Sequence, residues 1–246
     1  MRYLVVSDIH GNWEALQSVL NDARGRYDRI VCCGDLVGYG PDPNRIISWA
    51  RENLFACIRG NHDRACCGME DLEWFNPIAR EATIWTMAAL SEDSLTWLRA
   101  LQPGPIVVDG FMVAHGSPLD EDEYLMTLQD AANIFGYLEA NLTFFGHTHL
   151  QGGFAWVNGN RKLIWRPMED QEESMLRVDP DGLYLMNPGS VGQPRDADAR
   201  AGYAVYDTET RNITMRRVVY DYEAVRNKIE AVGLPPALGL RLAFGR

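Results

Sequence analysis

The chain has 246 residues, of which 46% are hydrophobic, and its formal net charge is −11. This composition is typical of a globular protein with enough apolar material for a sizeable core. The acidic balance argues against a general nucleic-acid binder, because such proteins carry a basic face. The chain lacks the run of about 18 apolar residues that a membrane helix needs. We also find no basic and apolar N-terminal stretch typical of a signal peptide, so we expect neither feature.

The cysteines indicate a reducing environment. There are five of them, and four form the adjacent pairs Cys32-Cys33 and Cys66-Cys67. An odd number with adjacent pairs makes a poor disulfide framework, so we predict free thiols and a cytoplasmic protein. Cys66-Cys67 follows a histidine motif and leaves a metal or redox role open. The absence of a Cys-x-x-Cys spacing favours simple apolar packing instead.

The first third of the chain alternates strand and helix patterns. Apolar runs predict strands and helical spacing predicts helices, in the order Arg2–Val6, Asn12–Ala23, Arg29–Cys33, Pro43–Asn53 and Phe55–Ile58. This β-α-β-α-β order is typical of a parallel sheet with helical crossovers. Two further helices are predicted at Leu72–Leu90 and Glu92–Leu101.

Strands dominate the remainder. Asp109-Gly110 and Asn158-Gly159 each separate two apolar runs, which predicts two β-hairpins. Helices are expected at Leu128–Ala140 and Tyr222–Val232, and strands at Leu142–Phe145, Leu183–Met186, Tyr203–Tyr206 and Ile213–Val219. We find no linker, so residues 1–246 predict one α/β domain, a four-layer α/β/β/α sandwich with two facing mixed sheets flanked by helices. Residues 233–246 are expected to form a poorly ordered tail.

All five histidines lie in short glycine-containing segments that follow apolar runs. The segments are Ser7-Asp-Ile-His-Gly11, Gly60-Asn-His-Asp63, Ala114-His-Gly-Ser117 and Gly146-His-Thr-His149, and Cys33-Gly-Asp-Leu36 has aspartate in place of histidine. Ligands of α/β sheets bind at the carboxyl ends of the strands. We therefore expect one edge to carry Asp8, His10, Asp35, Asn61, His62, His115, His147 and His149. Any one of these could be a turn or cap residue, but their joint placement, with the chelating His147-x-His149 pair, predicts a metal site.

The order of these segments resembles the signature of the calcineurin-like metallophosphoesterase superfamily, D-x-H, G-D, G-N-H-[D/E], H and G-H-x-H. The segment Asn187-Pro-Gly-Ser-Val-Gly-Gln-Pro-Arg195 is similar to the bacterial phosphodiesterase and diadenosine-tetraphosphatase-like branch. The resemblance implies that two divalent transition-metal ions bind (Mn, Fe, Zn, Ni or Co) and share a hydroxide that attacks phosphorus in line. It further implies that Asp35 bridges the metals, one held by Asp8, His10 and His149, the other by Asn61, His115 and His147.

The resemblance also assigns His62, which it leaves without a metal, as the group that stabilises or protonates the leaving oxygen. One departure matters. The second block reads Gly34-Asp-Leu-Val-Gly-Tyr-Gly40, whereas protein phosphatases of the superfamily read G-D-x-V-D-R-G. Gly38 thus replaces the aspartate that orients the catalytic histidine, and Tyr39 replaces a phosphate-binding arginine, which argues against protein phosphatase activity.

Several residues are candidates to orient the catalytic histidine or to bind phosphate and substrate. Asp63 is a candidate catalytic partner of His62. Arg195 is a candidate catalytic and phosphate-binding residue, or else an ordinary loop arginine in a salt bridge. Asn12 and Tyr39 are candidate substrate contacts, and Trp74-Phe75 could line a cleft.

The most specific function that the sequence predicts is a metal-dependent phosphoesterase that favours small phosphodiesters. Alternatives are a dinucleoside polyphosphate hydrolase, a phosphomonoesterase, or a metal-binding interaction scaffold that keeps the fold without catalysis. The complete ligand set and the presence of His62 argue against the scaffold. We expect no membrane partner, and nucleic acid only as a short substrate.

Overall fold

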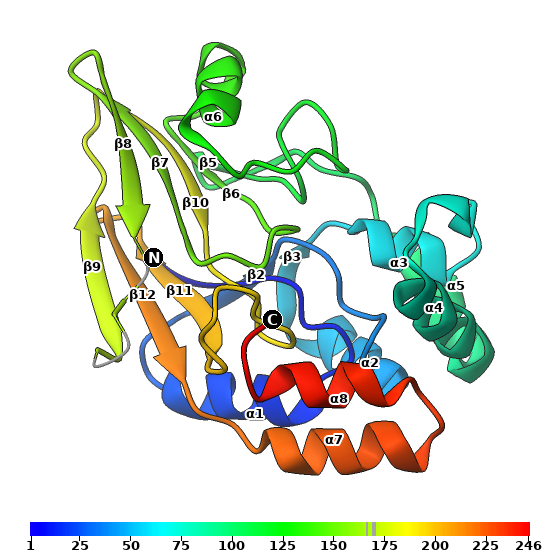
Figure 1. The fold of residues 1–246 in the computed structure, drawn as a ribbon. Coiled ribbons are helices and arrows are strands. Elements are labelled where there is room, and N and C mark those ends of the chain that lie inside the picture. The colour runs from blue at the N-terminus through cyan, green and yellow to red at the C-terminus, as the bar shows by residue number, and fades with distance from the viewer. Residues whose placement is uncertain (166, 169–170) are drawn as a thin grey trace.

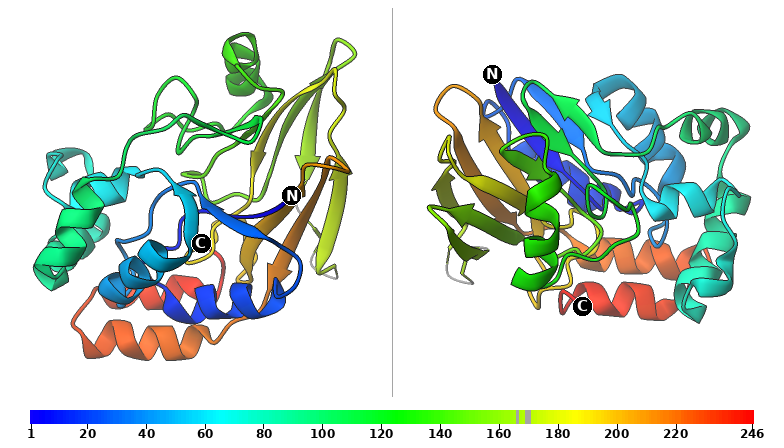
Figure 2. Two further views of the ribbon diagram at one scale, coloured as in Figure 1. Left: turned by 180° about the vertical axis from the view of Figure 1, so that it is seen from behind. Right: turned by 90° about the horizontal axis from the view of Figure 1, so that it is seen from above.

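The computed structural model describes residues 1–165, 167–168 and 171–246 of the chain (Figure 1). Within these residues, two six-stranded sheets stack on each other and helices cover their outer faces (Figures 1 and 2). The predicted α/β/β/α arrangement is therefore confirmed. No helix in the described part of the chain is long and apolar enough to cross a bilayer.

The first sheet has the strand order β3-β2-β1-β11-β12-β9. Its parallel part consists of β1 (Arg2–Val6), β2 (Arg29–Cys32) and β3 (Leu54–Cys57), connected by helices α1 (Trp13–Asp22) and α2 (Pro43–Asn53). Its antiparallel part consists of β11 (Ala201–Asp207), β12 (Asn212–Val218) and β9 (Glu173–Arg177). The parallel strands, as predicted, all end at the same edge.

The second sheet has the order β4-β5-β6-β10-β7-β8. Its strands are β4 (Ile106–Val108), β5 (Phe111–Val113), β6 (Leu142–Phe144), β10 (Leu183–Asn187), β7 (Gly152–Val157) and β8 (Asn160–Trp165). Both predicted hairpins are confirmed, β4-β5 around Asp109-Gly110 and β7-β8 around Asn158-Gly159. All four turn residues have positive φ, the backbone that two-residue hairpins with right-handed twist require.

Apolar side chains on both faces of β1 explain how the layers stay together. Tyr3 and Val5 point into the core between the sheets, and Leu4 and Val6 point into the core under the helices. This alternation is the period of two of an extended strand. A strand buried on both faces reads as a continuous apolar run, which is why β1 stands out in the sequence.

The region between the third strand and the second sheet differs from the prediction. A short helix α3 (Asn61–Cys66) follows β3 directly, and the long helix expected from Leu72 begins only at Pro77, as α4 (Pro77–Ala89). Asn76 caps α4 through its side chain, and proline is favoured at the first helical position. Before α4, residues Leu72–Trp74 form only a 3-10 turn, η1. After α4, helix α5 (Glu92–Arg99) follows.

The last two differences concern helix lengths. The helix expected over Leu128–Ala140 is shorter, α6 (Leu128–Ile134) followed by the 3-10 turn η2 (Phe135–Tyr137). After α7 (Tyr222–Ala231), the prediction of a poorly ordered tail is wrong, because α8 (Pro236–Leu242) packs against α7. Leu238 and Leu242, one turn apart, bury their side chains in the core beneath the helices. Helical spacing of these leucines was the signal that the nearby proline and glycine obscured.

Candidate metal centre

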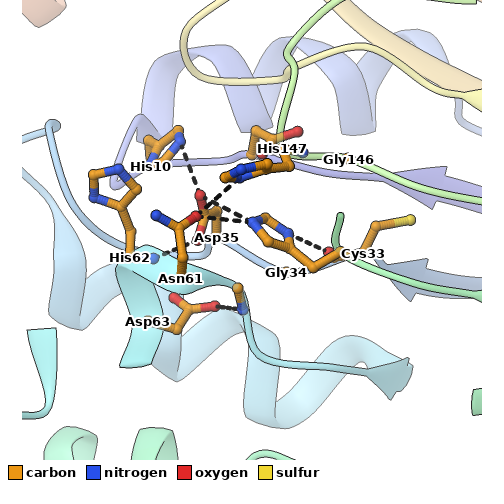
Figure 3. A network of polar contacts seen from close by, with 12 residues as sticks. His10, Cys33, Gly34, Asp35, Asn61, His62, Asp63, Gly146 and His147 are labelled. Carbon is orange, nitrogen blue, oxygen red and sulfur yellow. Dashed lines mark hydrogen bonds and ion pairs between the residues drawn. The ribbon is translucent and has the colours of Figure 1, made fainter. Parts of the chain in front are cut away.

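The eight side chains expected at one edge come together at the seam between the two sheets. Figure 3 shows His10, Asp35, Asn61, His62 and His147 among them. Asp8 and His10 follow β1, Asp35 follows β2, and Asn61 opens α3 directly after β3. His115 follows β5, and the pair His147 and His149 follows β6. The site therefore draws on the parallel strands of both sheets, and almost every side chain in it is buried.

One cluster combines two carboxylates and two imidazoles. Single ligand atoms of Asp8, His10, Asp35 and His149 all lie within 4.8 Å of one another. The Nε2 atoms of His10 and His149 are only 3.1 Å apart. His10 Nδ1 lies 2.9 Å from the carbonyl oxygen of Val37, and His149 Nδ1 lies 2.6 Å from that of Gln193.

These carbonyl contacts determine which nitrogen of each ring is free. A carbonyl only accepts hydrogen bonds, so Nδ1 of His10 and of His149 carries the hydrogen and Nε2 presents a lone pair. Burial lowers the pKa of both rings well below the usual histidine value, which keeps them neutral. Two neutral rings that direct lone pairs at each other across 3.1 Å repel each other, and a cation bound to both nitrogens would remove this repulsion.

A second cluster consists of Asp35, His115 and His147, with Asn61 at its centre. Asn61 Oδ1 lies 3.1 Å from both His115 Nε2 and His147 Nδ1. His115 Nδ1 donates to the carbonyl of Cys33 over 2.8 Å, and His147 Nε2 donates to that of Asp122 over 3.2 Å. When both rings are neutral, as metal ligands are, the nitrogens that face Asn61 therefore also present lone pairs, directed at an oxygen that accepts as well.

Asp35 belongs to both clusters. Its Oδ2 lies 3.5 Å from His10 Nε2 and 3.5 Å from His115 Nε2, and it has no hydrogen-bond partner. Asp8 Oδ2 is likewise buried without a partner. Leaving a buried carboxylate oxygen unpaired is costly, so these atoms fit metal ligation. The mixed set of imidazole, carboxylate and amide donors suits divalent transition metals.

The electrostatics of the centre also favour added positive charge. Burial raises the pKa of Asp8 to about 7, and the negative charge of Asp35 adds to this shift. Although burial opposes it, the Asp35 carboxylate raises the pKa of His115 to about 10. Without an ion, protons would thus bind at positions that a divalent cation neutralises better.

The backbone at the centre is strained. Five of the expected ligands have φ in the left-handed region: Asp8 (52°), His10 (48°), Asp35 (56°), His147 (63°) and His149 (60°). Such a conformation costs a non-glycine residue about 1–3 kcal/mol. Half of the ten non-glycine residues with positive φ in the described chain are expected ligands, and such a concentration is typical of a preorganised functional site.

His62 lies beside the clusters without joining them. Its backbone N–H donates to Asp35 Oδ1 over 2.9 Å, and its ring packs between Tyr39 at 4.4 Å and Phe75 at 5.2 Å between centroids. Its Nδ1 is buried and has no hydrogen-bond partner. Burial lowers the pKa of His62 to about 4 in the free protein.

Asp63 does not serve the catalytic role that we expected from its place beside His62. Its Oδ1 accepts the N–H groups of Leu36 and Val37 at 2.9 and 3.1 Å, and its Oδ2 accepts that of Gly60 at 3.0 Å. With three backbone amides on its carboxylate, Asp63 ties the loop after β2 to the start of α3. It therefore positions the Asp35 loop, and adjacency in sequence was misleading because successive residues of a helix point in different directions.

Gly38 explains why His62 lacks a carboxylate partner. Gly38 has φ +87°, and a Cβ built on it would lie 2.8 Å from His62 Nδ1. The ring thus lies directly against the glycine backbone. Any larger residue at this position would have to displace the imidazole.

This contact gives a test with a matched control. Gly38→Ala is expected to lower turnover of a diester with an alkyl alcohol as leaving group about 10²-fold, because a shift of His62 of about 1 Å suffices for such a loss. Gly25→Ala is the control, since Gly25 has φ +78° and open space around its Cβ. Both changes should cost about 1–2 kcal/mol of stability through the left-handed backbone. Equal turnover in the two variants would show that the position of His62 does not matter.

Arg195 lies beside the Tyr39 ring, near His10 and His62. Its guanidinium carbon is 5.7 Å from the centroid of the Tyr39 ring, and its Nη2 donates to Gln193 Oε1 over 3.0 Å. Its Nε is buried without a partner, and the described residues give it no ion pair, so the salt-bridge alternative is not supported. Burial is the main cause of the lowered pKa of His10 and His62, and the positive charge of Arg195 lowers both further.

Asn12 does not lie free for substrate. Its Oδ1 accepts the N–H of Ala15 over 3.0 Å, and its Nδ2 donates to the carbonyl of Gly192 over 2.8 Å. Both ends of the amide are used, so Asn12 caps α1 and ties it to the 187–195 segment. The expectation of a substrate contact is corrected accordingly.

A cleft of about 360 Å³ opens beside the second cluster. It is lined by Tyr39, Asn61, His62, Glu70, Trp74, Phe75, Asn76, Ala79, Asp122, Tyr124 and His147. The sequence indicated Trp74 and Phe75 but missed Asp122 and Tyr124, whose segment has neither helical nor strand periodicity. Arg64 holds that segment through ion pairs to Glu121 and Asp122, and the acidic run Asp120–Glu123 was the one available signal.

The comparisons with known proteins agree with this geometry. Residues 1–211 match the calcineurin-like phosphoesterase superfamily domain. An uncharacterised protein from Methanocaldococcus jannaschii is 35% identical over 253 positions, covering 98% of this chain and 97% of that protein. A metallophosphoesterase from Sphaerobacter thermophilus is 37% identical with a TM-score of 0.85, covering 100% of this chain and 99% of that one. A hypothetical protein from Pyrococcus horikoshii is 19% identical with a TM-score of 0.79, covering 100% and 98%, and shares the fold.

The family match over most of the chain thus coincides with a buried cluster of metal-binding side chains. The chain belongs to the calcineurin-like phosphoesterase superfamily, whose members are metal-dependent hydrolases of phosphate esters.

Proposed function

We propose that this protein is a phosphodiesterase that works with two divalent transition-metal ions, of which Mn²⁺ is the best activator. The observation that carries the proposal is the position of Asp35 Oδ2, 3.5 Å from a nitrogen of each of two ligand clusters. Bound side by side, two such ions would activate water and stabilise negative charge on the phosphate oxygens.

The ligands would divide as the family pattern implies. Asp8, His10 and His149 would hold one ion, and Asn61, His115 and His147 the other, with Asp35 in common. The carbonyl groups that receive the imidazole N–H bonds keep each ring in the orientation and tautomer for ligation.

His62 would donate the proton to the leaving oxygen. It lines the cleft beside the two clusters, and its ring is held by Tyr39, Phe75 and the backbone of Gly38. The pKa of His62 is lowered by burial in the free protein, and the negative charge of a bound phosphate ester favours its protonated form.

The preference for diesters follows from the limited positive charge at the entrance. A monoester is a dianion near neutral pH, and its recognition usually needs several charge-assisted donors. Here Tyr39 stands where protein phosphatases have an arginine, and Arg195 is the guanidinium that borders it. A diester carries one negative charge, so a single arginine beside the metals suffices.

The test compares two chromogenic substrates. Bis-p-nitrophenyl phosphate should have a higher kcat/KM than p-nitrophenyl phosphate, with Mn²⁺ giving the highest rates in a panel of divalent metals. Arg195→Ala should reduce kcat/KM for the monoester about 10–100-fold, the worth of one or two charge-assisted hydrogen bonds of about 1.5–3 kcal/mol. The diester should lose less.

Arg51→Ala is the control, since Arg51 is exposed in the last turn of α2. It should leave both rates unchanged. A wild-type enzyme that prefers the monoester would contradict the diesterase assignment without affecting the two-metal site.

A further inference from the structure

We infer that the cleft beside His62 binds an uncharged, planar aromatic leaving group, namely a nucleoside, with its base stacked on Trp74. The inference rests on the proposed function and adds the class of leaving group. In the hydrolysis, a water molecule loses one proton to solvent and its oxygen forms a bond to phosphorus. The bond from phosphorus to the nucleoside oxygen breaks, and that oxygen takes a proton from His62, which regains one from solvent.

The position of the cleft determines which part of the substrate enters it. Asn61 and His147, from the second ligand cluster, and His62 all line it. A phosphate held at the clusters with its leaving oxygen near His62 must extend its leaving group past these residues. The volume of about 360 Å³ admits a group the size of a nucleoside.

Aromatic side chains make up half of the rest of the lining, namely Tyr39, Trp74, Phe75 and Tyr124. Phe75 and Tyr39 are held by ring contacts with His62, and Tyr124 lies 3.9 Å from the ring of His147 between centroids. Trp74 differs from them because its side chain is 90% exposed. An exposed indole at the rim of a cleft offers a flat face for stacking, which contributes about 1–3 kcal/mol per base in nucleic-acid complexes.

Trp74 is held in place by local structure. It ends the 3-10 turn η1, which begins where Asp71 accepts the N–H of Glu73 over 3.0 Å. Two residues later, Asn76 caps α4. Upstream, Glu70 forms an ion pair of 2.9 Å with Arg64 of α3. A short, capped connection between two helices therefore fixes the backbone from which the exposed indole extends at the rim of the cleft.

The polar residues of the cleft select against a second phosphate. Glu70 and Asp122 both line it, and both pair with the one Arg64 side chain. Their carboxylate oxygens can accept hydrogen bonds from ribose hydroxyls or base amino groups. A leaving group with its own phosphates would face repulsion there, so a nucleoside fits and a nucleotide polyphosphate does not.

The test uses dinucleotides that differ only in the base of the leaving side. Thymidylyl-(3′→5′)-thymidine is compared with its analogue whose leaving nucleoside is an abasic tetrahydrofuran, and products are measured by chromatography. The base should raise kcat/KM about 10-fold in the wild-type enzyme, within the range expected for stacking. In Trp74→Ala, kcat/KM should be about equal for the two dinucleotides, and Trp74→Phe should restore most of the difference between them. Trp156→Ala is the control for loss of a tryptophan, because Trp156 lies on β7 and packs against Phe135.

A second readout does not depend on catalysis. Saturation-transfer NMR with thymidine and metal-free protein should show contacts to the base protons in the wild type and in Trp156→Ala, and none in Trp74→Ala. Equal kcat/KM for the two dinucleotides together with unchanged NMR contacts in Trp74→Ala would overturn the inference. If neither dinucleotide is hydrolysed but the contacts depend on Trp74, the phosphodiesterase assignment fails and the nucleoside site stands.

Discussion

Replacement of Asp35 by asparagine is expected to remove bound metal and activity together. The amide preserves the shape of the side chain and can still accept the N–H of His62, but it lacks the charge that both ligand clusters share. Because the ions contribute several kcal/mol to transition-state stabilisation, turnover of bis-p-nitrophenyl phosphate should fall by at least about 10³-fold. Elemental analysis of the purified protein should show the loss of both ions.

Thermal unfolding distinguishes loss of metal from loss of fold. The metal-free Asp35→Asn protein should still unfold in one cooperative transition above the assay temperature, since the amide keeps the hydrogen bond from His62, and His115, without the carboxylate that raises its pKa, can stay neutral. Asp28→Asn is the control, because Asp28 forms a surface ion pair with Arg2. It should retain metal and full activity. Full metal occupancy in Asp35→Asn would refute the bridging role.

His62→Ala should lose turnover but, unlike Asp35→Asn, should retain its metal. The ring of His62 contacts Tyr39 and Phe75 and belongs to neither ligand cluster, so elemental analysis should find the wild-type metal content. If the ring protonates the leaving oxygen, the loss should be about 10²–10⁴-fold for a diester with an alkyl alcohol as leaving group.

The identity of the leaving group makes this test specific. A p-nitrophenolate leaves without needing a proton, so His62→Ala should impair bis-p-nitrophenyl phosphate much less than an alkyl diester. A purely structural role for His62 would reduce both rates by the same factor. Loss of metal in His62→Ala would instead make this histidine a ligand.

Much of the fold could be predicted because the signals were local. The apolar run of β1 is buried on both faces, and the two Asp-Gly and Asn-Gly turns adopt the positive φ that only such residues tolerate well. The start of α4 and the existence of α8 were missed. The predicted helix extended through Pro77, although proline is favoured in the first turn of a helix and not in its interior, and the proline and glycine of the tail predicted irregular chain, although Pro236 opens α8.

The candidate ligands could be predicted for a related reason. Each follows a strand at its carboxyl end, and in a parallel sheet these ends meet at one edge whatever the rest of the chain does. The roles of residues outside that pattern could not be predicted. Asp63 and Asn12 turned out to bind backbone groups, because their hydrogen-bond partners come from other segments.

The sequence by itself determined the kinds and order of the metal-binding side chains, because both are properties of short segments. Only the tertiary structure decided which nitrogen of each histidine is free. That choice depends on the carbonyl groups of Val37, Cys33 and Gln193, which lie 27 to 82 residues away from the rings that they orient. The cleft is decided in the same way, since Trp74 and Tyr124 approach the centre only when two distant connections fold over it. Hydrogen bonds and ring contacts act over a few ångströms in space, so separation along the chain conceals them.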